Sequence, residues 1–465
     1  MSTLKIPKVA KYRRRVGKFG GPNVRHDESV LDFSAATRCY NFDFASGALR
    51  TGYGTAEHYA VPKEARRYWV YKYYSEEDKK YVEQYVYQQS DGYMRYYDSA
   101  RNTESYMAAF KFDPIDAINY RLNSKDVLLM SCRGRGLMVW NGTRFFEYES
   151  PAITSMALHY ERLFVTSPDQ PTKIFFSDDL DPTNWTTDAD AGGFIELLDE
   201  RGNLNKVVSF GNYLYIFRDH GISRVTAYGD QNEFSAVGLF VSAGRIYPSS
   251  ISKCGSSITF LASDGLYSFD GYDCVRRLTN LDGLIVPGDS CAAAFMGGKY
   301  YLACRMNFAD VEKVGCEADE HTNNALLVYD VTTGEYSITR GTDISAMEAC
   351  TYDGEDFLYA CDGERGGVVE RCGKRFEDSL PKHWQGPMTD FGMPDRDKTV
   401  REVYTDGDCE CRVTIANEKR KKTVDVLKGL KRTRVNMNCK KLSLAVDCAA
   451  AECTVKPPTL LYSVR

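Results

Sequence analysis

Long apolar runs are absent from this sequence of 465 residues. No stretch approaches the ~18–20 consecutive apolar residues that cross a bilayer as a helix. The first nineteen residues are basic and lack the continuous apolar segment of a signal peptide. We therefore expect no membrane-spanning segment, and a protein that is made and kept in a cytoplasm unless it leaves by lysis or inside a particle.

The motifs of common catalytic sites are also missing. There is no Gly-rich phosphate loop, no Gly-x-Ser-x-Gly and no His-Glu-x-x-His, and the six histidines are isolated from one another. Asp178, Asp179 and Asp181 are the best candidates for acid–base chemistry, but glycoside hydrolysis needs two carboxylates that face each other across a sugar. Asp-rich loops beside proline are more often turns. The sequence predicts no enzyme, no catalytic residue and no bound cofactor.

Cysteine, by contrast, is plentiful, with 15 residues scattered mostly through apolar, strand-like runs. This pattern is typical of reduced thiols that pack as small hydrophobic side chains, since secreted disulfide scaffolds are short and have paired cysteines. The alternative is a zinc site among the C-terminal cysteines, Cys409, Cys411, Cys439, Cys448 and Cys453. Cys409 and Cys411 alternate with Val413 and Ile415 on one strand face, as in an ordinary core. No CxxC pair accompanies them, so the sequence predicts no metal site.

The charge is slightly acidic overall but unevenly placed. The net charge of −5 and the pI near 5.8 argue against nucleic-acid binding by the bulk of the protein. Residues 1–25 contain no acidic residue, which predicts an extended basic arm that binds a polyanion or, equally, a solvated or docked tail. A second basic cluster near the C-terminus is favoured as a solvated hairpin tip. The candidate partner- or DNA-contacting residues are Lys8, Lys11, Arg13, Arg14, Arg15, Lys18, Lys419, Arg420, Lys421 and Lys422.

A repeat organises the middle of the chain. Residues 204–278 contain two consecutive meanders of short β-rich runs separated by Gly, Asp and Asn turns, and Val208 and Ile251 hold equivalent places 43 residues apart. A period of about 40–45 residues with four strands is typical of a β-propeller blade. Similar units occupy residues 66–98, 117–148, 153–187, 291–341 and 344–373.

These units predict an all-β protein. Because the strands of one blade can be divided between the chain ends, the count is six or seven blades. From about residue 384 a linker with proline and glycine is followed by alternating strands, which predicts a C-terminal β-sandwich. The expected domains are a basic arm at 1–25, a β-propeller at 26–383 and a sandwich at 384–465.

Three stretches resemble one known family. The first is Asn41-Phe42-Asp43-Phe44 followed by Gly47-Ala48-Leu49-Arg50 and Gly52-Tyr53-Gly54. The second and most specific is Leu163-Phe164-Val165 followed by Ile174-Phe175-Phe176-Ser177-Asp178 and Asp181-Pro182-Thr183-Asn184-Trp185. The third is the small sandwich after a propeller. Together they are similar to propeller-type tail proteins of bacteriophages, which include tail hubs, nozzles and tail accessory factors of short-tailed phages.

The resemblance implies a structural virion protein of the tail, assembled in the host cytoplasm. It implies a homo-oligomeric ring, six copies by analogy, around the channel through which double-stranded DNA leaves during ejection. Its partners would be other tail or head–tail connector proteins. The alternatives are a receptor- or glycan-binding propeller at the tail tip and, less favoured, a propeller glycoside hydrolase.

Overall fold

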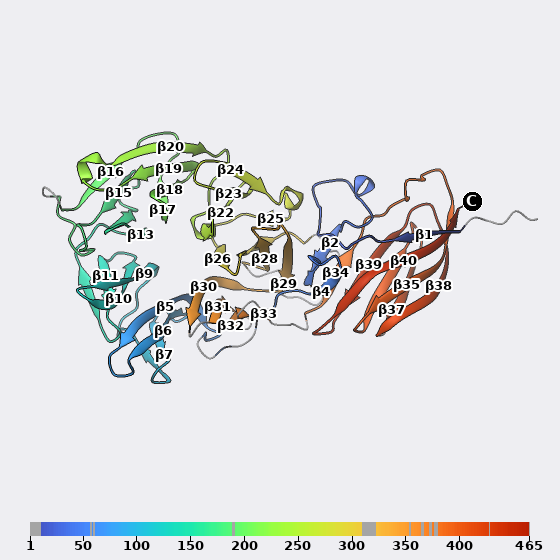
Figure 1. The fold of residues 1–465 in the computed structure, drawn as a ribbon, viewed down its shortest axis with the longest axis horizontal. Coiled ribbons are helices and arrows are strands. Elements are labelled where there is room, and N and C mark those ends of the chain that lie inside the picture. The colour runs from blue at the N-terminus through green and yellow to red at the C-terminus, as the bar shows by residue number, and fades with distance from the viewer. Residues whose placement is uncertain are drawn as a thin grey trace, which may run out of the picture.

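The protein is all-β, as expected, and its strands are distributed over many small sheets (Figure 1). The computed structural model describes residues 11–464 except 56–57, 59–60, 188–190, 309–321, 353–354, 364–366, 372–373, 376–379 and 427. Its helical elements in these residues are short 3-10 turns: η1 (Glu28–Val30), η2 (Gln231–Glu233), η3 (Pro248–Ser250) and η4 (Thr279–Leu281). No helix in the described ranges has the length and apolar character needed to cross a membrane.

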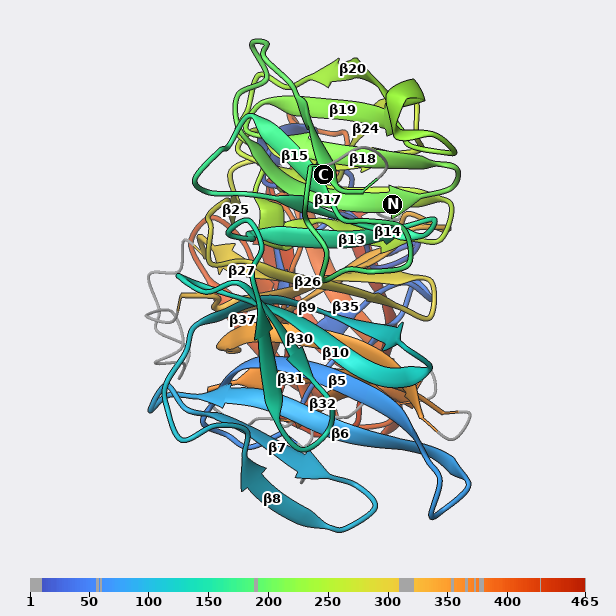
Figure 2. The ribbon, with the colours of Figure 1, turned by 90° about the vertical axis from the view of Figure 1, so that its left-hand side faces the viewer.

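Seven small antiparallel sheets, counted over the described residues, follow one another along the chain and form a propeller-like ring (Figures 1 and 2). The first sheet contains β5 (Ala65–Ser75), β6 (Lys80–Gln89), β7 (Met94–Asp98) and β8 (Thr103–Tyr106). The second contains β9 (Pro114–Leu122), β10 (Lys125–Cys132), β11 (Leu137–Trp140) and β12 (Phe145–Tyr148). The third contains β13 (Ser155–His159), β14 (Arg162–Thr166), β15 (Lys173–Phe176) and β16 (Gly193–Glu196).

The next two sheets are β17 (Leu204–Phe210), β18 (Tyr213–Arg218), β19 (Gly221–Thr226) and β20 (Ser235–Val241), and β21 (Ser252–Cys254), β22 (Ser257–Ala262), β23 (Gly265–Phe269) and β24 (Cys274–Arg277). The last two are β25 (Ile285–Val286), β26 (Ala292–Met296), β27 (Lys299–Met306), β28 (Ala325–Asp330) and β29 (Tyr336–Arg340), and β30 (Ile344–Tyr352), β31 (Glu355–Asp362), β32 (Gly367–Arg371) and β33 (Lys374–Arg375).

Local turn chemistry sets the hairpins of these sheets. Asn141 and Gly142 form the turn between β11 and β12, with Gly142 at φ 93°, and the Asn141 side chain accepts the backbone N–H of Thr143 at 3.0 Å. A positive φ favours glycine, which is why this dipeptide is a strong hairpin signal. β18, the second strand of its sheet, is deeply buried, and its Leu214 and Ile216 are fully buried.

The ring closes where the sheet of β30–β33 packs on the sheet of β5–β8. Tyr359 of β31 lies between Tyr68 of β5 and Tyr85 of β6, with ring centroids 5.4 and 5.5 Å apart. All three are buried. Aromatic pairs at this separation add to the stabilisation from burial. Closure therefore rests on packing between the first and last sheets of the ring, which have no strand in common.

The remaining strands form a separate two-sheet domain, which we define as residues 11–51 and 382–464. One sheet has the order β3 (Phe42–Asp43), β4 (Leu49–Thr51), β40 (Thr454–Val464), β35 (Lys398–Gly407) and β38 (Gly429–Cys439), with β1 (Lys11–Arg15) also on β40. The other has the order β2 (Arg38–Tyr40), β34 (Lys382–Gln385), β39 (Ser443–Cys448), β36 (Cys411–Ala416) and β37 (Lys421–Val426). The two sheets share one hydrophobic cluster.

The N-terminal boundaries expected from the sequence need correction here. Residues 11–15, expected in an extended basic arm, pair as β1 with β40, and residues 38–51, expected in the propeller, pair as β2, β3 and β4 within the two-sheet domain. Pairing between strands some 400 positions apart leaves no local trace in the sequence. The ring is thus inserted between two parts of the two-sheet domain. Residues 1–10 lie outside the described residues.

Hydrogen bonds join the two-sheet domain to the outer strand of one ring sheet. The Asn41 backbone N–H donates to the Ile338 carbonyl of β29 at 2.8 Å, and the Asn41 side chain accepts the N–H of Arg340 at 2.7 Å. The Thr339 hydroxyl donates to the Tyr53 carbonyl at 2.7 Å. Asn41 has a φ of 61°, a region that asparagine tolerates better than most residues. These contacts fix one side of the ring to the two-sheet domain.

Phe19 tests whether the N-terminal segment is part of the core. It is 1% exposed and meets Trp384 edge-to-face at 4.7 Å. We expect Phe19→Ala to lower the free energy of unfolding by about 3–5 kcal/mol, because it removes a buried aromatic ring. Denaturant unfolding of the full chain followed by tryptophan fluorescence measures this. Val24→Ala, at a site 40% exposed, is the control. Equal effects of the two changes would show that residues 16–25 are not part of the core.

Candidate functional site

The basic residues singled out from the sequence fall on two different edges of the two-sheet domain. Lys11, Arg13 and Arg15 are exposed on β1, which pairs with β40. Arg14 is half-buried over the Phe391 ring at 5.6 Å. Lys18 is exposed just beyond β1. Lys8 lies outside the described residues. The described basic residues of the N-terminal group therefore lie on the edge strand β1 and on the segment that follows it.

The C-terminal group lies at the turn between β36 and β37 and along β37. The Asn417 side chain accepts the backbone N–H groups of Lys419 and Arg420 at 2.9 and 2.6 Å, which shapes the turn that exposes both residues. Lys421 and Lys422 begin β37, the last strand of its sheet, and the Lys422 ammonium donates to the Arg434 carbonyl of β38 at 2.7 Å. Lysine on an edge strand also prevents edge-to-edge pairing of sheets.

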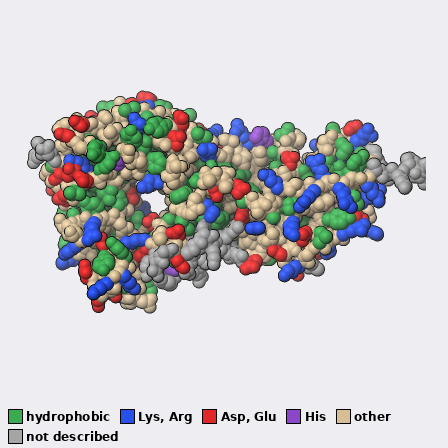
Figure 3. Space-filling model, in the orientation of Figure 1, with side chains coloured by type: hydrophobic (Ala, Val, Ile, Leu, Met, Phe, Trp, Pro, Cys, Tyr) green, Lys and Arg blue, Asp and Glu red, His purple; other side chains and the backbone are tan. Residues whose placement is uncertain are grey.

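Charge is divided between the two parts of the molecule. Residues 52–381, which contain the ring, carry 32 Lys and Arg against 49 Asp and Glu. Residues 11–51 and 382–465 carry 25 Lys and Arg against 15 Asp and Glu. The space-filling view shows Lys and Arg side chains gathered over the two-sheet domain (Figure 3). The modest net charge of the whole chain thus conceals an acidic ring and a basic two-sheet domain.

A cavity of about 530 Å³ occupies the centre of the ring, where the space-filling view is hollowed (Figure 3). Every ring sheet or the turn before it contributes to its wall, with Arg67, Asp116, Ser155, Lys206, Ser249, Ala292 and Glu348. Asp116 accepts the N–H groups of Met156 and Ala117 at 3.1 and 3.0 Å. Burial raises the pKa of Asp116. Sequence patterns gave no sign of this cluster, because its members come from seven separate units.

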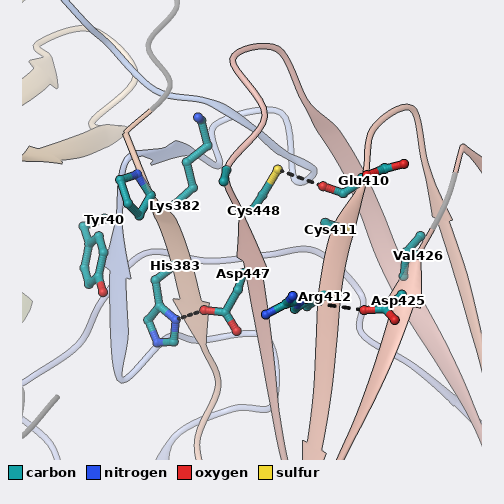
Figure 4. A pocket seen from close by; sticks show the side chains of 12 residues that line it. Tyr40, Lys382, His383, Glu410, Cys411, Arg412, Asp425, Val426, Asp447 and Cys448 are labelled. Carbon is teal, nitrogen blue, oxygen red and sulfur yellow. Dashed lines mark hydrogen bonds and ion pairs between the residues drawn. The ribbon is translucent and has the colours of Figure 1, made fainter. Parts of the chain in front are cut away.

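A second cavity, of about 610 Å³, lies on the two-sheet domain (Figure 4). Its floor carries a row of residues that face one another across five neighbouring strands, in the order Tyr40, His383, Asp447, Arg412 and Asp425. The His383 ring nitrogen lies 2.7 Å from Asp447, and the Arg412 guanidinium lies 3.8 Å from Asp425. Opposite charges directly across strands stabilise a sheet, and the row is typical of such pairing.

The acidic loop that raised the question of catalysis is held by its own turn. Asp178 accepts the Asn184 amide at 2.9 Å, and Asp181 accepts the Thr183 hydroxyl at 2.6 Å. Asp179 pairs with the buried Arg162 guanidinium at 3.0 Å. Each of the three carboxylates therefore has a structural partner. The fold also brings together three of the C-terminal cysteines, Cys409, Cys448 and Cys453.

Comparison with known proteins leaves the function open. No protein-family model matches the chain, and no curated protein matches it. Among solved structures, BBS1N in complex with ARL6DN aligns with 69% of this chain and 97% of its own, at 10% identity and a TM-score of 0.41. Hsv2 of Kluyveromyces lactis aligns with 55% of this chain and 81% of its own, at 11% identity and a TM-score of 0.32. Likenesses at this level carry no conclusion about function.

Glu348 gives a pH test of the central cavity. Burial raises the pKa of Glu348 to about 8, and the negative charge of Asp116 adds to the rise, while Lys206 and Lys72 oppose it. An acid whose pKa is higher in the folded protein than in the unfolded chain loses stabilising free energy as pH rises between those two values. That window runs from about 4.3, the unfolded value, to about 8.

We expect Glu348→Gln, which imitates the protonated acid, to match the wild type near pH 4 and to melt at a higher temperature above pH 8. Thermal unfolding measured across this range checks the expectation. The exposed Glu76→Gln is the matched control and should follow the wild-type curve throughout. A difference between Glu348→Gln and wild type that stays constant with pH would contradict the burial of this carboxylate.

Proposed function

We propose that this protein is a structural subunit of a bacteriophage tail, located in the virion and assembled in the host cytoplasm, and that it catalyses no reaction. In this proposal the seven ring sheets are the blades of a β-propeller, and the two-sheet domain is a β-sandwich into which the propeller is inserted. Support for the blades comes from the central cavity, to whose wall each ring sheet or the turn before it contributes. Support for the phage assignment comes from the sequence resemblance at residues 41–54 and 163–185.

The observation that carries the proposal is the division of charge between ring and two-sheet domain. An acidic surface at one end of a subunit and a basic surface at the other favour head-to-tail association of copies, since opposite potentials steer and orient docking. Contacts of this heterologous kind close into rings when the rotation between copies permits. This arrangement supports a homo-oligomeric ring, six copies by the resemblance, and other tail or connector proteins would dock on its remaining faces.

The same division of charge suits a ring through which DNA passes. Acidic propellers repel the phosphate backbone and leave double-stranded DNA free to slide, whereas the basic edge of β1 offers a contact for phosphate or for a neighbouring protein. A few basic residues give binding that is weak and strongly dependent on salt, which is compatible with transient passage.

A second function is favoured by exposed aromatic pairs on the ring. Tyr160 and Tyr228 are both exposed and meet edge-to-face at 5.1 Å, and Tyr74 and Tyr81 are exposed with centroids 5.5 Å apart. Exposed aromatic faces are suited to stacking on sugars. This supports a receptor- or glycan-binding propeller at the tail tip as the alternative. A glycan array with Tyr228→Ala as the comparison distinguishes it from a purely structural subunit.

Oligomer formation tests the principal proposal. We expect negative-stain micrographs of the full chain at low salt to show rings, and mass photometry to show that they dissociate in 1 M salt, where charges are screened beyond about 3 Å. Lys419→Glu with Arg420→Glu should shift the population toward monomer, because it reverses charge on the exposed turn. The control, Lys79→Glu with Lys80→Glu, reverses two exposed charges on the ring and should leave the rings intact. A monomer at every salt concentration would refute the ring.

DNA binding is tested separately by neutralising β1. We expect Lys11→Gln, Arg13→Gln and Arg15→Gln together to flatten the dependence of log K on log salt by about 0.9 for each phosphate that the variant no longer neutralises. Fluorescence anisotropy with a short DNA duplex measures the slope, and Lys79→Gln with Lys80→Gln is the control. An unchanged slope would assign β1 to protein contact or solvent instead of DNA.

A further inference from the structure

Three cysteine thiols meet at one end of the two-sheet domain, where the chain crosses twice between the sheets. Cys409 lies on the crossover from β35 to β36. Cys448 ends β39, and Cys453 immediately precedes β40, so these two bracket the crossover from β39 to β40. The thiols therefore come from both crossovers, and anything that binds all three ties the two sheets together.

The spacing of the sulfur atoms suits a tetrahedral metal ion. The three Sγ atoms lie within 4.8 Å of one another, and those of Cys409 and Cys448 are 3.8 Å apart. Zinc–thiolate bonds of about 2.3 Å in a tetrahedron place two sulfur atoms about 3.8 Å apart. All three residues are at most 8% exposed, which is typical of structural rather than catalytic zinc sites.

Two of the three sulfur atoms have hydrogen-bond donors beside them. The Ala450 backbone N–H donates to Cys448 Sγ at 3.4 Å, and the Thr51 hydroxyl lies 3.6 Å from Cys453 Sγ. Lys382 is directly opposite Cys448 across the β34–β39 pair, is 2% exposed, and donates through Nζ to the Ala450 carbonyl at 2.7 Å. Backbone and hydroxyl donors of this kind accompany metal-bound thiolates as their outer partners.

A fourth thiol is within reach of the same position. Cys411 lies directly opposite Cys448 in the β36–β39 pair and is 5% exposed. Directly opposed residues have Cβ atoms about 4.5–5.5 Å apart, so the Cys411 sulfur can reach a shared ion by a side-chain rotation. Four cysteines on the two crossovers and at the strand ends beside them then form a complete ligand set.

We propose that Cys409, Cys448 and Cys453, with Cys411 as the fourth ligand, bind one zinc-type divalent cation that clamps the two sheets. This differs from the absence of a metal site expected from the sequence, an expectation that rests on strand alternation and on the lack of a CxxC pair. The ligands instead come as Cys-x-Cys and Cys-x₄-Cys with 36 residues between the two pairs, a spacing with no familiar signature. The site is independent of the proposed tail function.

Metal analysis of the full chain tests this proposal. Protein purified with reductant and without chelator should carry about one zinc per chain by plasma mass spectrometry. Cys448→Ser should lose it. Cys439→Ser is the matched control, because Cys439 is equally buried in the same cluster but outside the thiol group, and it should retain the metal.

Cobalt substitution of the wild type gives a readout that does not depend on whether a variant folds. Reconstitution with Co²⁺ should produce the intense thiolate-to-cobalt band and the visible bands of tetrahedral cobalt. Cys439→Ser should show the same spectrum. Folded wild type that carries no zinc and gives no thiolate–cobalt band would overturn the proposal, as would a disulfide among these cysteines in freshly isolated protein, seen as a loss of two hydrogens by intact mass.

Discussion

The architecture depends on hydrogen-bonded pairing between the two ends of the chain. β4 pairs with β40 and β2 with β34, so residues near 40 and 50 are held against residues near 384 and 455. Every ring sheet is built from strands that are consecutive in the sequence. The first and last sheets of the ring are therefore not joined to each other by a shared strand. The paired ends bring the entry and exit of the ring together, and the aromatic contact of Tyr359 with Tyr68 then packs the first sheet on the last. Pairing the two ends of the chain in this way requires the conformational entropy of closing one long loop, which contains the whole ring.

The ring and the two-sheet domain that brings its ends together have surfaces of opposite net charge. The ring segment contains more carboxylates than lysines and arginines, and the two-sheet domain presents lysine and arginine on the strands and turns at its edges, such as β1 and β37. The hydrogen bonds from Asn41 to β29 keep these surfaces at a fixed relation. A subunit with opposite charges at its two ends suits assembly with other copies of itself, and the proposed role in a tail ring depends on that property rather than on any single residue.

Polar side chains from separate segments converge at two places in the molecule. On the ring axis, Asp116, Lys206 and Glu348 come from three different sheets and share one cavity, where the charge of Asp116 raises the pKa of Glu348 and the charge of Lys206 opposes that rise. In the two-sheet domain, Cys409, Cys448 and Cys453 converge where two crossovers meet. Burying a charge is costly unless an opposite charge lies near it, and for Asp116 and Glu348 that opposite charge is Lys206, which is distant from both in the sequence.

The sequence by itself determined the local structure: the all-β class, the four-strand units with the 43-residue spacing of Val208 and Ile251, hairpins such as Asn141-Gly142, and the strands between 398 and 464. It also located the exposed basic turn at Lys419 and Arg420, because turns and exposed charges are encoded by neighbouring residues. Only the tertiary structure decided that residues 11–51 belong with the C-terminal strands, that three cysteines share one point, and that Glu348 faces Asp116. Those facts arise from contacts between segments far apart in the chain, which follow no local period and appear only when the sheets pack.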